Sequence, residues 1–72
     1  AASYAEVQVE VPDAPGALGE LFLAAGRARI NLEDVRIEHT VGRLTAIAHL
    51  YVLPEVAVDL RQALADDWPV LD

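Results

Sequence analysis

The run from Leu44 to Leu53 constrains the fold more than any other part of this 72-residue sequence. It is apolar at nearly every position, with Thr45 and His49 as the exceptions. A strand that is apolar on both faces usually lies in the middle of a sheet. We therefore expect one set of alternate residues to face the helices and the other to line the opposite face. The first set is Leu44, Ala46, Ala48, Leu50 and Val52, and the second is Ile47, His49 and Tyr51.

Three further segments are predicted to be strands. Tyr4–Val11 alternates between apolar residues and Glu or Gln, which is typical of a strand with one face in water. Pro12 ends this strand because proline has no N–H for the ladder. In the second strand, residues 30–39, the apolar parity changes at Glu33-Asp34, which predicts a bulge or kink there. Trp68–Leu71 is predicted to be a short last strand.

Two segments have the apolar spacing of amphipathic helices. The first begins after the turn Asp13–Gly16, where Asp13 is a candidate cap and Pro15 stands near the first helical position. The second begins at Pro54. The apolar stripes are Leu18, Leu21, Phe22, Ala25 and Ala28 in the first helix, and Val56, Ala57, Leu60, Ala63 and Leu64 in the second.

The order of these elements is βαββαβ, which predicts an α+β fold of the ferredoxin-like type. We expect a single domain over residues 1–72, with a four-stranded antiparallel sheet and two helices on one face. The first and third strands would lie in the middle and the second at an exposed edge. Glu6, Gln8 and Glu10 would then lie beside Ile47, His49 and Tyr51, on a face whose apolar half is either a contact surface or a partly wet sheet face.

Composition narrows the function. The formal net charge is −7, with no lysine, which argues against binding a nucleic-acid backbone. The absence of cysteine excludes disulfides and thiolate metal sites. A chain of this size buries only about 60% of its unfolded surface, so we expect a partner surface to contribute stability. We also expect the chain to be a piece of a longer protein, with residues 1–3 frayed.

The inventory of reactive side chains does not support an enzyme. Ser3 is the only serine, and the four glycines form no dinucleotide-binding fingerprint. His39 and His49 are candidate acids or bases, but a strand end and a half-open sheet face explain them as well. No apolar run is long enough for a membrane span, and no leader is evident. We expect a cytoplasmic protein without a metal or cofactor of its own.

Two stretches, VEVPDAPGAL at residues 9–18 and ARINL at residues 28–32, resemble the ACT domain family. The usual signature of that family is D-x-P-G-x-L followed by G-x-N-I at the start of the second strand. The resemblance spans Tyr4 to Leu71. More narrowly, Asn31–His39 with Gly42-Arg43 is similar to the C-terminal ACT domain of one group of bacterial prephenate dehydrogenases.

The resemblance implies a site for an amino-acid effector between the first loop of one copy and the second strand of another. The residues that it assigns to ligand binding are Asp13, Ala14, Pro15, Gly16, Ala17, Leu18, Asn31 and Leu32. A helix N-terminus suits the ligand's carboxylate, Asp13 would accept from its ammonium group, and Asn31 offers both a donor and an acceptor. A cap at Asp13, a turn at Asn31 and backbone geometry at Gly16 and Pro15 are the structural alternatives.

Two positions depart from the family pattern. Arg29 and Asp67 stand where glycine is usual. If the first helix ends in a left-handed residue at Arg29, the side chain there costs about 1 kcal/mol. Aspartate tolerates the left-handed region better, so the change at Asp67 matters less.

These features predict an amino-acid-binding allosteric regulatory domain that forms a homodimer and contacts the catalytic domain of its parent chain. By resemblance the parent is prephenate dehydrogenase, which would bind NAD or NADP, and the effector is L-tyrosine or another amino acid. Neither nucleic acid nor membrane is expected as a partner. The alternative is a dimerisation or interaction module of a metabolic enzyme or transcription regulator, without ligand sensing.

Overall fold

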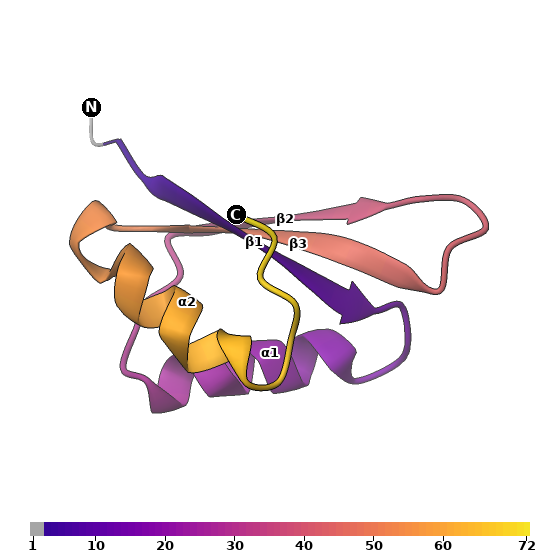
Figure 1. Ribbon diagram of the computed structural model, residues 1–72, viewed down its shortest axis with the longest axis horizontal. Helices are drawn as coiled ribbons and strands as arrows, with labels where there is room; N and C mark the ends of the chain where they lie inside the picture. Colours follow the sequence, from indigo (N-terminus) through magenta and orange to yellow (C-terminus); the bar gives the residue numbers. More distant parts are fainter. Residues whose placement is uncertain (1–2) are drawn as a thin grey trace.

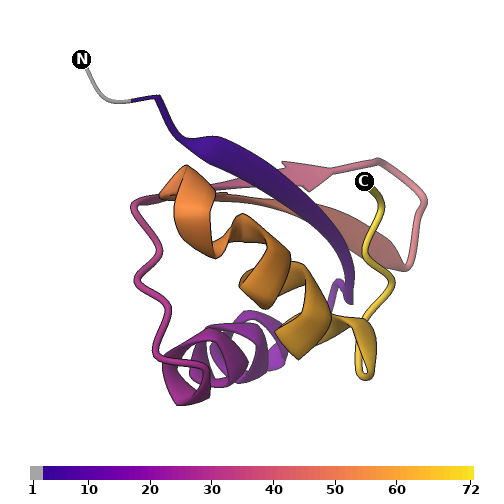
Figure 2. The same ribbon diagram turned by 60° about the vertical axis from the view of Figure 1, so that its left-hand side comes forward.

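The chain folds into a three-stranded antiparallel sheet with two helices on one face (Figures 1 and 2). The structure is a computed structural model that describes residues 3–72. The strands are β1 (Ala5–Pro12), β2 (Asp34–His39) and β3 (Thr45–Val52). The helices are α1 (Ala17–Arg27), the 3₁₀ turn η1 (Pro54–Val56) and α2 (Ala57–Ala65). Residues 1–3 were expected to be frayed. Residues 1 and 2 lie outside the described residues, and Ser3 is exposed.

β3 lies in the middle of the sheet, between β1 and β2, as its apolar pattern predicts. Ala46, Ala48, Leu50 and Val52 are all buried and face the helices. Leu44 was expected with them but is 90% exposed. It lies in the β2–β3 turn before β3 begins, and this hairpin projects beyond the helices (Figure 1).

The core lies between the sheet and the helices. Each helix has a buried stripe, formed by Leu21 and Ala25 in α1 and by Ala57, Leu60 and Leu64 in α2. Three predicted members of these stripes, Phe22, Ala28 and Ala63, are exposed. β1 contributes Val7, Val9 and Val11, which alternate with half-buried polar residues as predicted.

The prediction for the start of the second strand was wrong. Two residues after α1, Arg29 has φ 63, and the Arg29 and Ile30 N–H groups donate to the carbonyls of Gly26 and Ala25 at 3.0 and 3.1 Å. This pair of bonds is the Schellman motif, and it turns Ile30 into the core, where it is 8% exposed. β2 therefore begins at Asp34, and its register with β3 is continuous, so the change of parity marks the start of the strand and not a bulge.

The predicted last strand forms only one isolated bridge, from Val70 to Val9, on the outer side of β1. Glu10 N–H donates to the Pro69 carbonyl at 3.0 Å, and Leu71 N–H donates to the Gln8 carbonyl at 2.8 Å. Pro69 itself has no N–H to extend this ladder, so the four-stranded sheet is not confirmed. Asp67 is not among the residues with positive φ in the described part of the chain.

Candidate functional site

The loop Asp13–Gly16 connects β1 to the N-terminus of α1. Gly16 is the N-cap residue, at φ 83, and Ala17 N–H donates to the Ala14 carbonyl at 3.2 Å. A Cβ at Gly16 would meet nothing within 4 Å, so glycine is required by the backbone conformation and not by space. No side chain caps the helix, and the interpretation of Asp13 as a cap was wrong. With Ala14, Pro15 and Gly16 between it and the helix, Asp13 stands outside the capping position.

Asp13 instead joins the loop to the β2–β3 hairpin. Its N–H donates to the Leu44 carbonyl at 2.9 Å, and its Oδ2 lies 3.3 Å from Nδ1 of His39. The side chains of His39 and Asp13 are 63% and 47% exposed, so solvent screens this pair strongly. His39 is the last residue of β2, as the sequence predicted. The Asp13 carboxylate is accessible to a ligand, but it already contacts the His39 ring.

Asn31 and Leu32 lie in the connection from α1 to β2. Asn31 Nδ2 donates to Oε2 of Glu33 at 3.0 Å on an exposed surface. Leu32 is half-buried and packs against the core. The turn after α1 lies at residues 28–29, before Asn31, and the Asn31 side chain uses one of its two N–H donors for Glu33.

The predicted site residues fall into two groups at opposite ends of α1 (Figure 1). Residues 13–18 lie at its N-terminus and residues 31–32 follow its C-terminus. An α-helix rises 1.5 Å per residue, so α1 separates the two groups by about 16 Å. A single chain does not bring them together.

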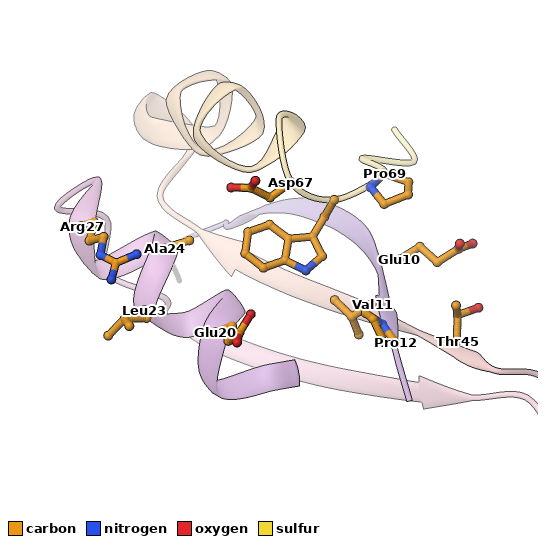
Figure 3. A pocket seen from close by; sticks show the side chains of 11 residues that line it. Glu10, Val11, Pro12, Glu20, Leu23, Ala24, Arg27, Thr45, Asp67 and Pro69 are labelled. Carbon is orange, nitrogen blue, oxygen red and sulfur yellow. The ribbon is translucent and has the colours of Figure 1, made fainter. Parts of the chain in front are cut away.

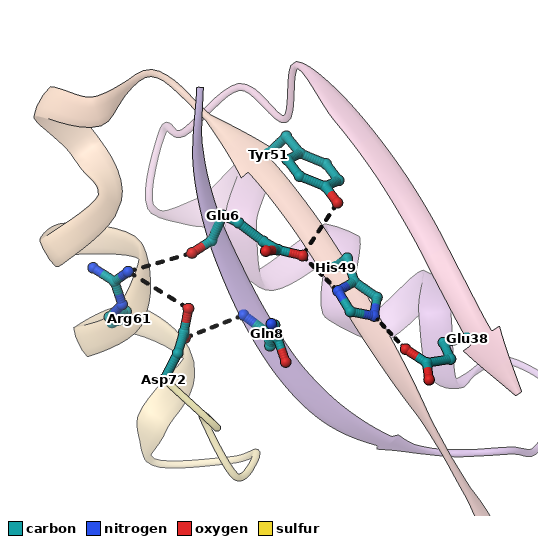
Figure 4. A network of polar contacts seen from close by, with 7 residues as sticks. All are labelled: Glu6, Gln8, Glu38, His49, Tyr51, Arg61 and Asp72. Atoms are coloured by element: carbon teal, nitrogen blue, oxygen red, sulfur yellow. Dashed lines mark hydrogen bonds and ion pairs between the residues drawn. The ribbon is translucent and has the colours of Figure 1, made fainter. Parts of the chain in front are cut away.

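A polar network that the sequence did not predict covers the open face of the sheet (Figure 4). His49 on β3 is 5% exposed and lies between two carboxylates. Its Nδ1 is 2.6 Å from Glu6 Oε2 on β1, and its Nε2 is 2.8 Å from Glu38 Oε1 on β2. The Tyr51 hydroxyl also donates to Glu6 Oε2, at 3.1 Å. Of the two alternatives for this face, a contact surface or a partly wet sheet face, the polar network favours the second.

Hydrogen bonding in this network changes the acidity of one carboxyl group. The contact with His49 holds the pKa of Glu6 below its ordinary value of 4.5; desolvation opposes this, and the Tyr51 hydroxyl adds to it. The expectation that Glu6, Gln8 and Glu10 lie beside Ile47, His49 and Tyr51 is confirmed by the register of β1 and β3. The contribution of Glu38 was missed because it depends on the register of β2, which the sequence misplaced.

The C-terminus extends the network along the outer edge of β1. Arg61 Nη2 donates to the Glu6 carbonyl at 3.3 Å and lies 3.7 Å from Asp72 Oδ2 (Figure 4). Asp72 Oδ1 accepts from the Gln8 N–H at 3.2 Å. These contacts hold the last residues against β1 where a full strand is missing.

A cleft of about 760 Å³ opens between α1 and the segment 67–69 (Figure 3). Glu20, Leu23, Ala24 and Arg27 of α1 form one wall, Asp67, Trp68 and Pro69 form the other, and the end of β1 closes it with Glu10, Val11 and Pro12. None of the eight predicted ligand-binding residues lines this cleft. Its position follows from the incomplete last strand, which the sequence did not reveal.

No family model, curated protein or solved structure matches this chain. Within residues 3–72, no cluster of His, Cys, Asp or Glu is arranged to hold a metal ion. Among the helices of that same stretch, none is both long enough and apolar enough to cross a membrane.

Proposed function

We propose that the chain is an amino-acid-binding regulatory domain of the ACT type. The observation that carries this proposal is the uncapped N-terminus of α1 beside Asp13. The N–H groups of Leu18 and Gly19 have no hydrogen-bond partner among residues 3–72. Free amides at a helix N-terminus favour a carboxylate, and a carboxylate such as that of Asp13, in the loop before the helix, favours an ammonium group. Together they match the two charges of a free amino acid.

The proposed site is completed between two copies of the chain. Residues 13–18 and residues 31–32 are separated by the length of α1, so each chain supplies two half-sites. β2 is an edge strand whose outer backbone groups pair with no other described strand, and Asn31-Leu32 lead into it. Edge strands of this kind are ready to pair with a second chain. A ligand that prefers one arrangement of the two copies would shift the population toward it, which is how the signal would reach a parent enzyme.

The similarity to the C-terminal ACT domain of bacterial prephenate dehydrogenases suggests a parent enzyme and an effector. We propose a cytoplasmic prephenate dehydrogenase as the parent, with NAD or NADP bound by its catalytic domain, and L-tyrosine as the first effector to test. Residues Asn31–His39 and Gly42-Arg43 carry this assignment.

The alternative is an interaction module without ligand sensing. Two contacts favour it: Asp13 lies against His39, and Asn31 donates to Glu33. A ligand would have to compete with both. The exposed β2 edge serves dimerisation equally well in either case.

Calorimetric titration of the 72-residue chain with each proteinogenic amino acid tests the proposal, with sedimentation measured in parallel. We expect heat and a raised Tm with L-tyrosine or a related amino acid, and a dimer. Asp13→Ala and Asn31→Ala should each weaken binding, whereas Asp59→Ala, on the first turn of α2, should not. A dimer that binds none of the amino acids would establish the interaction module instead.

A further inference from the structure

The cleft between α1 and residues 67–69 has charges that the fold leaves unpaired. Glu10, Glu20, Asp67 and Arg27 line it, and none of them takes part in an ion pair within residues 3–72. Three carboxylates therefore face one guanidinium. Arg27 lies at one end of the cleft and Glu10 at the other (Figure 3). A concave surface lined mainly by one sign of charge concentrates ligands of the opposite sign.

Trp68 gives this acidic cleft an aromatic wall. Its side chain is half-buried against the core and lines the cleft between Asp67 and Pro69 in the sequence. The indole N–H has no hydrogen-bond partner in the described part of the chain. Leu23 adds aliphatic surface on the α1 side. Carboxylates together with the face of a tryptophan ring are the groups that hold organic cations.

We propose that this cleft binds a small organic cation, namely an amine or guanidine carried on an apolar body. The cationic group lies among the carboxylates, and the body packs against Trp68 and Leu23. The volume of about 760 Å³ lies within the range of small-molecule sites, roughly 300–1,000 Å³. Arg27 disfavours a molecule that is cationic along its whole length, so the site selects a single charge. The cleft shares no residue with positions 13–18 and 31–32, so it is independent of the proposed amino-acid site.

Trp68 is the only tryptophan in the sequence, so its fluorescence reports on this cleft alone. Three probes share a phenylethyl group and differ in the charged groups that it carries: phenethylamine is a cation, L-phenylalanine a zwitterion and hydrocinnamate an anion. We expect phenethylamine to change the Trp68 emission saturably and to shift the amide resonances of residues 67–69 and of α1. Hydrocinnamate should do neither, and added salt should weaken the binding of phenethylamine.

Two variants test the carboxylates. Glu20→Gln combined with Asp67→Asn should weaken phenethylamine binding roughly threefold or more, as the loss of exposed charge pairs implies. Asp59→Asn, which lies outside the cleft, should leave it unchanged. The proposal is overturned if phenethylamine gives no saturable change, or if hydrocinnamate or L-phenylalanine binds the cleft equally well. Shifts at residues 13–18 and 31–32 with L-phenylalanine would support the amino-acid site, whatever happens at the cleft.

Discussion

Nδ1 of His49 lies 2.6 Å from Oε2 of Glu6, while the other ring nitrogen lies 2.8 Å from Glu38. An imidazolium donates to both carboxylates, whereas a neutral imidazole has only one N–H. The three residues come from β3, β1 and β2, so one side chain connects the whole sheet on the face that the helices leave open.

Replacing His49 should therefore destabilise the sheet. In His49→Leu, Glu6 and Glu38 lose their shared donor and repel each other across β3. We expect the free energy of unfolding to fall by about 1–3 kcal/mol, measured by urea denaturation. Adding Glu6→Gln and Glu38→Gln to His49→Leu removes the repulsion and should recover part of the loss. Equal stability of His49→Leu and the unmodified chain would contradict the connection.

The lowered pKa of Glu6 predicts how stability depends on pH. In the folded state the pKa of Glu6 is below its ordinary value of 4.5, so the carboxyl group stays ionised at a pH where the unfolded chain already binds a proton. The stabilisation is present above 4.5 and is lost as pH falls through the lower folded value. Glu6→Gln should flatten the acid limb of a plot of unfolding free energy against pH. Glu55→Gln, outside the network, should leave that limb unchanged if the assignment is correct.

The left-handed conformation of Arg29 predicts a stabilising substitution. At φ 63 a side chain is strained, and glycine is not. Arg29→Gly should raise the free energy of unfolding by about 0.5–1 kcal/mol, since relief of strain exceeds the extra entropy of the unfolded chain. Arg27→Gly, inside α1, is the matched control and should destabilise, because a helical residue gains nothing from glycine. If Arg29→Gly also destabilises, the end of α1 differs from the one described.

Gly16 and Gly19 predict opposite effects of the same substitution. A Cβ added at either position would meet no atom within 4 Å. The two glycines differ in conformation, because Gly16 has φ 83 and Gly19 lies within α1. Gly16→Ala should lower the free energy of unfolding by about 1 kcal/mol, and Gly19→Ala should raise it by about 0.5–1 kcal/mol. Thermal denaturation of the two variants checks this directly. The same sign for both would show that the loop can relax around Gly16.

The alternation of apolar and polar residues predicted those features of the sheet that depend only on which side chains are buried. The apolar run of β3 correctly implied a central strand, and the alternation of β1 correctly placed its Glu and Gln side chains beside Ile47, His49 and Tyr51. A left-handed residue at Arg29 was considered because the ACT pattern has glycine there, and Arg29 has φ 63. These features depend on local chemistry or on a period of two residues.

The rest depended on contacts between distant segments. Asp13 was interpreted as a cap, but the loop places it beside His39 at the far end of β2. Ile30 was assigned to a strand, but the end of α1 draws it into the core. The contact of His49 with Glu38 depends on the register of β2, and the cleft is lined by residues from β1, α1 and segment 67–69. No periodicity in the sequence carries such information.

The strand order has a consequence for the order of events in folding. β2 and β3 are joined by a short turn, whereas β1 pairs with β3 across the whole of α1 and β2, so that Ala5 meets Val52. Closing that long loop is the larger entropic barrier. We expect amides of the β2–β3 hairpin to gain protection first in pulsed hydrogen exchange during refolding. His49 would then meet Glu38 before Glu6 arrives with β1.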